Sequence, residues 1–591
     1  MRSPASPDGR TRRLLLGTIV PALLFAAGST KPYRLESDAA YQAKTVQQFL
    51  AGRSPLPNVL VTADPDDLAR DVQGWIGLWP PSFPTLLTPI LAAGVPIGVA
   101  ARLIAFGATA LGTTGWLVCA TELTVAPKTG WVVLTLASYA IVASTPTTTA
   151  ALDVLSFSCL PWCYVWALRL TRPPMVSRRP GIPAVMILMT LLGSVYVIKY
   201  SALFGAGALA LYVASELVQG REPGRTRGML LVVAGIGAFV SPALLLTLVN
   251  RAIGSGEPGE VLARIGHAAT PLDVLASAGR GFSGAYFGIG DGLDRAARSL
   301  GAGETAVLWR LILGIPALLL LGCVLLGCRA RLGRRPAILA GLTAMVPIVC
   351  LGCLHGWYGY PFTVDALRHV RPYWVFLELV SISMLVSWGS SSSRTVRLTV
   401  LLGAVYLVAP NVYSAYKFLR YDVGRWGAEP YRASDHRLWV PTLATRDVTH
   451  VLDAVQHAIR SRDDVVVIAA PWLGMEAWLE IPNRILPLTN FWQPLCKTHG
   501  RDGADFFASS PFRSSRALRV VLVASDLYAL ETFPQDIARL TRRFPQARTW
   551  MLVRAGVPGE AAAVLVADLA AEQTALPPAA GPRRHHSCLD S

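Results

Sequence analysis

Residues 229–250 read MLLVVAGIGAFVSPALLLTLVN, a run of 22 residues that contains no Asp, Glu, Lys or Arg. A helix that crosses a bilayer needs roughly 17 to 25 consecutive apolar residues, so this run predicts a membrane span. The composition of the whole chain agrees, because 52% of its residues are hydrophobic and only 15% are charged. That balance is far from the composition of a soluble domain and predicts a polytopic α-helical membrane protein.

Other apolar runs have a similar length, so the chain is predicted to cross the membrane about eleven times. These runs lie near 13–30, 100–121, 131–147, 154–170, 182–198, 201–217, 307–328, 337–353, 372–388 and 397–413. The apolar stretch from Phe83 to Gly94 is short and contains Pro84 and Pro89, which interrupt helices. We expect this stretch to lie at the outer surface of the membrane, or to form a broken or re-entrant helix.

The distribution of arginine predicts the orientation, because short loops rich in Lys and Arg stay in the cytoplasm. Clusters precede the first run and fall in three later loops, at 10–13, 169–179, 221–227 and 329–335. Eleven spans with a cytoplasmic N-terminus place the C-terminal part outside, in a bacterial-type inner membrane. The formal net charge of +17 then reflects topology and lipid-facing charge, with no indication of nucleic-acid binding. Alternatively, the first run is a cleaved signal peptide.

Three regions lie outside the predicted spans. Within a transmembrane module of residues 1–413, residues 31–99 form a first external loop and residues 251–306 a second. Residues 414–574 are predicted to form a small extracytoplasmic α/β domain, because short strand-like runs alternate with helical patterns there. The strand-like runs are 464–470, 518–524 and 549–553, and the helical patterns are 448–460 and 535–543. The tail at 575–591 has too little apolar content to fold.

No metal site is predicted. Cys159 and Cys163 lie one helical turn apart, but no His or carboxylate is spaced to complete a zinc site. The sequence Asp64-Pro65-Asp66-Asp67 looks like an Asp-x-Asp metal motif, yet it is better explained as a helix start. Asp64 would cap that helix and Pro65 would occupy its first turn.

The residues that follow the first apolar run form a recognisable order. Asp38 lies in LESDAAYQA, Tyr41 follows within one turn, Gly52 ends the next stretch, and WPPSFP begins at Trp79. This order resembles the GT-C superfamily of lipid-linked glycosyltransferases, such as protein O-mannosyltransferases and aminoarabinose transferases of lipid A. The chain departs from the paired Asp-Glu of the O-mannosyltransferases, because Ala39 follows Asp38. The sugar and the acceptor are therefore not predicted.

The resemblance makes Asp38 the candidate base that deprotonates an acceptor hydroxyl. Glu36, two residues earlier, is the nearest alternative and could share this role. The structural alternative is that Asp38 caps a helix that starts at Ala39, a role that Asp fills well.

Three further residues match positions where related enzymes carry functional groups. Asp153 precedes the span that ends at Leu170, and would position the acceptor or a divalent cation; its alternative role is a helix cap. Lys199 interrupts an apolar run, and would bind the donor phosphate as a point charge, unless it only reaches to the interface. Arg371 opens a late span and is a second candidate phosphate ligand, although Arg also anchors helices at the interface.

The function predicted from the resemblance is inverting transfer of a sugar from a polyprenyl-phosphate donor to a hydroxyl of a glycan, lipid or protein, outside the membrane. No cofactor is required by any motif, beyond the cation that Asp153 could position. The alternative is a polytopic transporter or lipid flippase. Transporters tend to contain inverted repeats, and no repeat is evident in this sequence.

Overall fold

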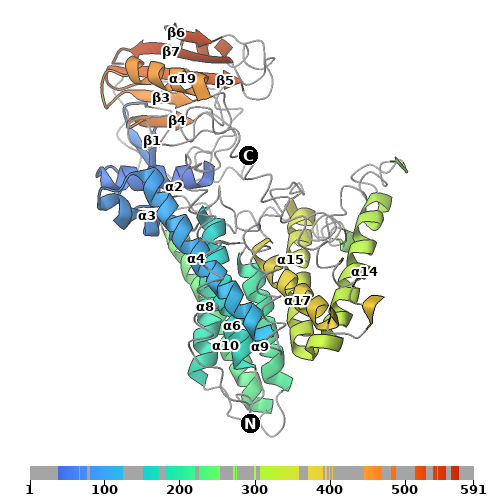
Figure 1. The fold of residues 1–591 in the computed structure, drawn as a ribbon. Coiled ribbons are helices and arrows are strands. Elements are labelled where there is room, and N and C mark those ends of the chain that lie inside the picture. The colour runs from blue at the N-terminus through green and yellow to red at the C-terminus, as the bar shows by residue number, and fades with distance from the viewer. Residues whose placement is uncertain are drawn as a thin grey trace.

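The computed structural model has a helical bundle at one end and a mixed sheet at the other (Figure 1). The residues it describes are 37–64, 67–75, 80–123, 151–171, 182–200, 202–219, 225–252, 307–358, 371–389, 445–468, 481–487, 513–526, 544–553 and 561–571, with a few single residues between them. The predicted spans at 13–30 and 131–147, and nearly all of 397–413, lie outside these residues, as does the predicted disordered tail.

Each of the other eight predicted spans coincides with one helix. These helices are α4 (Ile97–Leu123), α6 (Ala151–Leu170), α8 (Ile182–Ile198), α9 (Ala202–Gln219), α10 (Arg225–Ala252), α14 (Val307–Leu332), α15 (Arg334–Tyr358) and α17 (Arg371–Gly389). By length and composition, four of them can cross a membrane: α4, and most of α10, α14 and α17. The chain is therefore a multi-pass membrane protein, and the total of eleven spans stays a prediction.

Helices α4 and α6 run side by side in the same direction. A Cβ atom on Gly112 of α4 would lie 2.5 Å from Cδ1 of Phe157 in α6, so glycine permits this close approach. Further along both helices, an Arg169 guanidinium nitrogen lies 2.9 Å from Glu122 Oε1. The two contacts, at Gly112 with Phe157 and at Glu122 with Arg169, show that the two helices are parallel.

Polar contacts join α6, α9 and α15 at one end of the bundle. Arg335 lies 2.9 Å from Glu216 and donates a hydrogen bond to the carbonyl of Thr171. The Thr171 hydroxyl lies 2.9 Å from the hydroxyl of Tyr212. A planar guanidinium can bind a carboxylate and a carbonyl at the same time, so these contacts join the three helix ends.

At the opposite end, helices α2 (Ser37–Leu50) and α3 (Ser82–Ala92) lie across the bundle, between it and the sheet (Figure 1). Gly94, at a positive φ of 80°, separates α3 from α4. The stretch from Phe83 to Gly94 thus contains a short helix of its own, and its place at the membrane surface stays a prediction.

An antiparallel hairpin connects α2 and α3 and consists of β1 (Val59–Ala63) and β2 (Asp71–Trp75). The helix start predicted at Asp64 is therefore wrong, because Asp64 follows β1 directly and its backbone N–H donates to Arg70 O across the hairpin turn. Asp67 does accept a backbone hydrogen bond two residues ahead, from Ala69 N at 3.1 Å. The acidic residues thus stabilise a turn, which Asp does as readily as it caps a helix.

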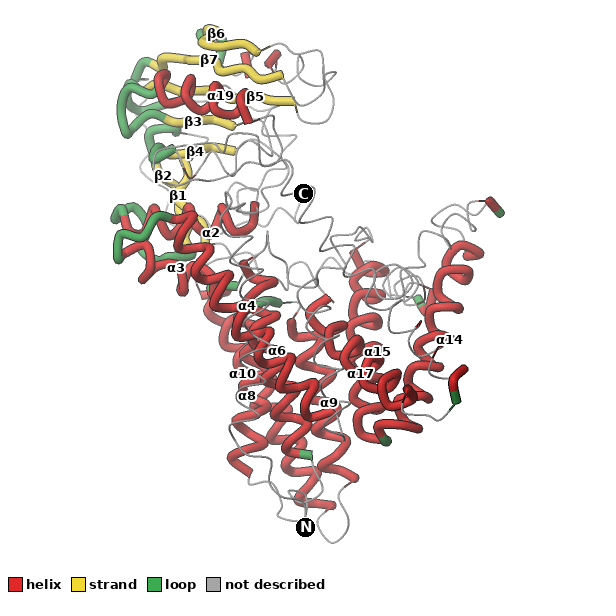
Figure 2. Tube along the Cα trace, viewed as in Figure 1, coloured by secondary structure: helices red, strands yellow, loops and turns green. Residues whose placement is uncertain are grey.

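The C-terminal part contains a five-stranded sheet in the order β4-β3-β5-β7-β6. The strands are β3 (Val465–Ile468), β4 (Arg484–Pro487), β5 (Leu518–Asp526), β6 (Arg548–Val553) and β7 (Ala561–Leu569), and helix α19 (Thr445–Ala458) packs on the sheet (Figure 2). Strands β4, β3 and β5 are parallel, whereas β7 is antiparallel to both neighbours. Three strands and α19 match the predicted runs; β4 and β7 were not predicted. Of the helical pattern at 535–543, only four residues are described, and all four are helical.

One continuous hydrophobic cluster joins the sheet to the first-loop elements. It contains Tyr41 of α2, Phe83 of α3, Leu155 of α6, Val455 of α19 and Val466 of β3, all at most 7% exposed. The sheet is thus joined to the bundle through the elements of the first loop.

Candidate active site

Helix α2 carries the predicted base at its start. The helix begins at Ser37, so Asp38 is a first-turn residue and not the residue before the helix. A negative charge in the first turn is favoured by the helix dipole, which gives Asp38 a local reason to occur there whatever its role. Buried residues follow at once, since Ala39, Ala40 and Tyr41 are at most 2% exposed. Glu36 lies outside the described residues.

Hydrogen bonds lead from α2 to α3 and then to α8. Gln42, one helical turn after Asp38, is fully buried, and its Nε2 donates to the carbonyl of Pro80 at 3.3 Å. Ser82 Oγ in turn donates to the carbonyl of Ile198 at 3.1 Å. Ile198 directly precedes Lys199, so these contacts bring the helix with the predicted base to the residue predicted to bind phosphate.

Lys199 is held in a buried turn between α8 and α9. Its backbone N–H donates to Val195 O at 3.0 Å, and its carbonyl accepts from Ala202 N at 2.9 Å. The residue is only 8% exposed. The residue therefore does not project into open solvent, and its binding of a phosphate stays a prediction.

Aromatic and amide groups from three elements gather around this turn. Trp75 of β2 donates from Nε1 to Asn250 Oδ1 of α10 at 2.9 Å. The Asn250 side chain is also hydrogen-bonded to the Tyr200 hydroxyl, and the rings of Tyr196 and Tyr200 lie 4.7 Å apart. Sequence reasoning missed Trp75 and Asn250. The available signal was an Asn as the last residue of the apolar run 229–250 and a Trp in the first loop.

Asp153 and Arg371 belong to the same end of the bundle. Asp153 is the third residue of α6, and Leu155 beside it joins the hydrophobic cluster around α2. Arg371 is the first residue of α17. Close packing of Gly205, near the start of α9, against Tyr373 places the first turns of α17 and α9 next to each other. The structure thus brings together the helix ends that carry the two residues and Lys199.

No group of three or more His, Cys, Asp or Glu is placed to hold a metal ion among the residues that the structure describes. Lys199 and, by its place in the chain, Arg371 are the cationic residues predicted for the site. Trp79 of the predicted WPPSFP motif lies outside the described residues, whereas Pro80 and Pro81 lead into α3.

Comparison of the whole structure defines the class of fold. No protein-family model matches the sequence, and no curated protein matches it significantly. The solved structure of ArnT from Cupriavidus metallidurans in the apo state superposes with a TM-score of 0.52 at 12% identity, over 94% of this chain and 98% of that chain. ArnT is a GT-C aminoarabinose transferase. The chain therefore has a GT-C fold, which confirms the fold expected from the first-loop motif.

Two other solved structures show lower similarity. ArnT from Cupriavidus metallidurans bound to undecaprenyl phosphate gives a TM-score of 0.45 at 12% identity, over 95% of this chain and 98% of that chain. The mycobacterial arabinofuranosyltransferase AftD gives 0.43 at 14% identity, over 96% of this chain and 42% of that chain.

Proposed function

We propose that the protein is an inverting GT-C glycosyltransferase that transfers a sugar from a polyprenyl-phosphate donor to an acceptor hydroxyl. The proposal places the site on the extracytoplasmic side of a bacterial inner membrane, with the N-terminus in the cytoplasm. The observation that carries it is the meeting of four elements at one end of the bundle: the starts of α2, α6 and α17, and the buried turn after α8. They bear Asp38, Asp153, Arg371 and Lys199 respectively.

In this mechanism Asp38 accepts the proton of the acceptor hydroxyl. The oxygen attacks the anomeric carbon from the face opposite the phosphate, a new C–O bond forms, and the polyprenyl phosphate departs with the electrons of the broken C–O bond. Lys199 and Arg371 stabilise the negative charge that develops on the leaving phosphate. Asp153 orients the acceptor, directly or through a divalent cation.

The burial of Lys199 supports its proposed role. An ammonium with little solvent around it interacts more strongly with a developing negative charge than an exposed one does. Its compact shape suits a single phosphate oxygen. Undecaprenyl phosphate is the ligand of one ArnT structure, and assigning the same class of carrier to this chain is part of the proposal.

A transporter or flippase is the competing function, and it would have to open the opposite end of the bundle. There, Arg335 joins α6, α9 and α15 through Glu216 and the Thr171 carbonyl. The Arg335 side chain is 35% exposed and that of Glu216 10%, so opening this end would break a partly buried ion pair and a hydrogen bond. A site reached from one end, as in a transferase, needs no such opening.

The test is direct transfer by the purified protein in lipid nanodiscs. A panel of radiolabelled polyprenyl-phosphate sugars is supplied with crude envelope glycan, lipid and protein fractions as acceptors. We expect one labelled sugar to move to one fraction. Energy-independent movement of intact labelled lipid between leaflets, with no sugar transferred or released, would instead establish a flippase and refute the proposal.

A further inference from the structure

Helix α2 is held by residues that precede strand β4 and lie more than 400 positions away in the sequence. Lys44 donates from Nζ to the carbonyl of Ile481, Gln47 Nε2 donates to Leu479 O at 3.3 Å, and Arg53 Nη1 donates to Pro482 O at 2.8 Å. Residues 479 and 481–484 are called here the clamp segment. Two residues of α2 and one residue just after its end thus bond to the backbone of one short segment.

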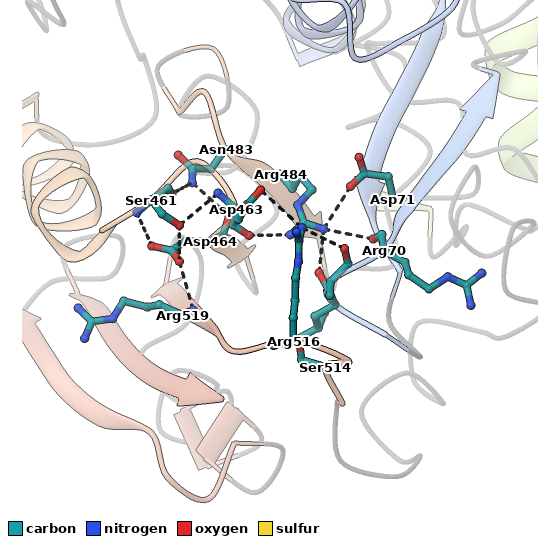
Figure 3. Close-up of polar contacts among 12 residues, drawn as sticks. Arg70, Asp71, Ser461, Asp463, Asp464, Asn483, Arg484, Ser514, Arg516 and Arg519 are labelled. Carbon is teal, nitrogen blue, oxygen red and sulfur yellow. Dashed lines mark hydrogen bonds and ion pairs between the residues drawn. The ribbon is translucent and has the colours of Figure 1, made fainter. Parts of the chain in front are cut away.

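Arg484, the last residue of the clamp segment, holds the β1–β2 hairpin (Figure 3). Its side chain is 5% exposed, and its two terminal nitrogens donate to Leu68 O at 2.9 Å, to Asp71 Oδ1 at 3.2 Å and to Asp463 O at 2.6 Å. The planar guanidinium can serve several acceptors at fixed angles, which a lysine ammonium cannot. One buried cation therefore joins the hairpin turn to the loop before β3.

The hairpin is also hydrogen-bonded to α2. The Gln48 amide donates to Val61 O at 2.7 Å and accepts from Val61 N at 2.8 Å, so one side chain satisfies both backbone groups of a β1 residue. On the sheet side, Asp67 Oδ1 accepts from Ser515 N at 2.9 Å. The sheet therefore reaches α2 by two routes, directly through the clamp segment and indirectly through the hairpin.

These contacts matter because helix α2 depends on neighbouring elements for its stability and position. An isolated helix of its length, 14 residues, is marginal in water. Its first half contacts the residues that lead into α3, through Gln42 and Pro80, and its second half contacts the clamp segment. A displacement of about 1 Å in a catalytic group can cost about a hundredfold in rate.

We propose that the clamp segment positions α2, and that Lys44 and Arg484 are positioning residues for the base at its start. This inference rests on the proposed function, in which Asp38 must face the donor held at Lys199. The extracytoplasmic sheet is then part of the catalytic apparatus, although none of its described residues is assigned to the chemistry.

The experiment compares Arg484→Gln, Arg484→Lys and Lys44→Met with the wild-type protein by hydrogen exchange and by transfer kinetics. Losing hydrogen bonds to a charged group costs about 1.5 to 3 kcal/mol, so amides at 39–50 and 59–75 should exchange about 10-fold to 100-fold faster. The turnover number should fall by a similar factor while the donor KM changes by less than about twofold. Arg484→Lys should recover part of both effects, because charge is kept and the planar geometry is lost.

Arg519→Gln is the matched control. Arg519 lies on β5, its side chain is 3% exposed, and it bonds to Asp568 at 2.7 Å and to Ala458 O at 3.1 Å, all within the sheet and α19. Loss of the Arg519 guanidinium should accelerate hydrogen exchange of the backbone amides at 451–458 and 561–569, and should leave the amides at 39–50 protected. Should Arg484→Gln fail to fold, Lys44→Met tests the same proposal from the α2 side.

Unchanged exchange at 39–50 in both Arg484→Gln and Lys44→Met would overturn the inference, as would an equal effect of Arg519→Gln there. The exchange measurement needs no substrate. A wild-type protein that transfers no sugar would therefore refute the proposed function alone, while the exchange data still decide whether the clamp exists.

Discussion

Replacing Lys199 is expected to weaken donor binding without unfolding the protein. Lys199 is 8% exposed and follows Ile198, whose carbonyl accepts a hydrogen bond from Ser82 of α3. A hydrogen bond to a charged group contributes about 1.5 to 3 kcal/mol. Because about 1.4 kcal/mol corresponds to a tenfold change in affinity, Lys199→Met should raise the donor Kd by about 10-fold to 100-fold. Methionine keeps the apolar stem of the side chain and removes only the charge.

The assay is direct binding of a labelled polyprenyl phosphate to the purified protein in detergent, at several salt concentrations. Lys199→Arg should keep part of the affinity, because the charge survives while the compact geometry does not. Arg169→Gln serves as the control, since it removes a cation paired with Glu122 where α4 and α6 end, away from the site. Equal affinity of Lys199→Met and the wild-type protein would show that Lys199 only anchors the helix, and would remove it from the site.

Further predictions concern stability, pH and topology. Gly193→Ala should lower the melting temperature in detergent, because its Cβ would lie 2.0 Å from the carbonyl oxygen of Phe239; Gly207→Ala, with nothing within 4 Å, should not. Burial raises the pKa of Asp67, but hydrogen bonds from Ser515 and Ala69 outweigh it and lower the pKa below its ordinary value. Asp67→Asn should therefore destabilise the protein above pH about 4, and the difference should vanish as pH falls through the lowered pKa; a constant difference would refute this. Cysteine labelling should modify a probe near Arg432 from outside and one near Arg225 from inside, and the reverse pattern would contradict the proposed side of the site.

Much of the bundle could be predicted from the sequence, because an apolar run of span length has few structures open to it in a bilayer. The helices α8, α9 and α17 begin and end within one or two residues of the predicted runs. The likeness of the first loop to GT-C enzymes also led to the correct fold.

Other elements gave weak or misleading local signals. Strand β7 reads AAAVLVADL, and its alanines favour helix over strand. It becomes a strand because β5 and β6 supply hydrogen-bond partners on both sides. The sequence at Asp64 carries the residue types of both a helix start and a turn, and pairing of β1 with β2 selects the turn.

The contacts that define the site's surroundings could not be predicted from one sequence. Lys44 meets Ile481, and Arg484 meets Leu68, across more than 400 residues of chain. No periodicity or spacing encodes such a pair. The sequence showed only that Lys44 is one of few lysines and that Arg484 precedes a short apolar run.

The central claim is that Asp38 acts as the base, and Asp38→Asn tests it most directly. Asn has nearly the same shape as Asp and is equally acceptable at a helix start, so the variant should fold and bind donor normally. The Asn amide, however, cannot take up the proton of the acceptor hydroxyl. We predict that single-turnover transfer of labelled sugar falls by about 10²-fold to 10⁴-fold, with donor Kd unchanged. Transfer at the wild-type rate would contradict the account and exclude Asp38 as the base.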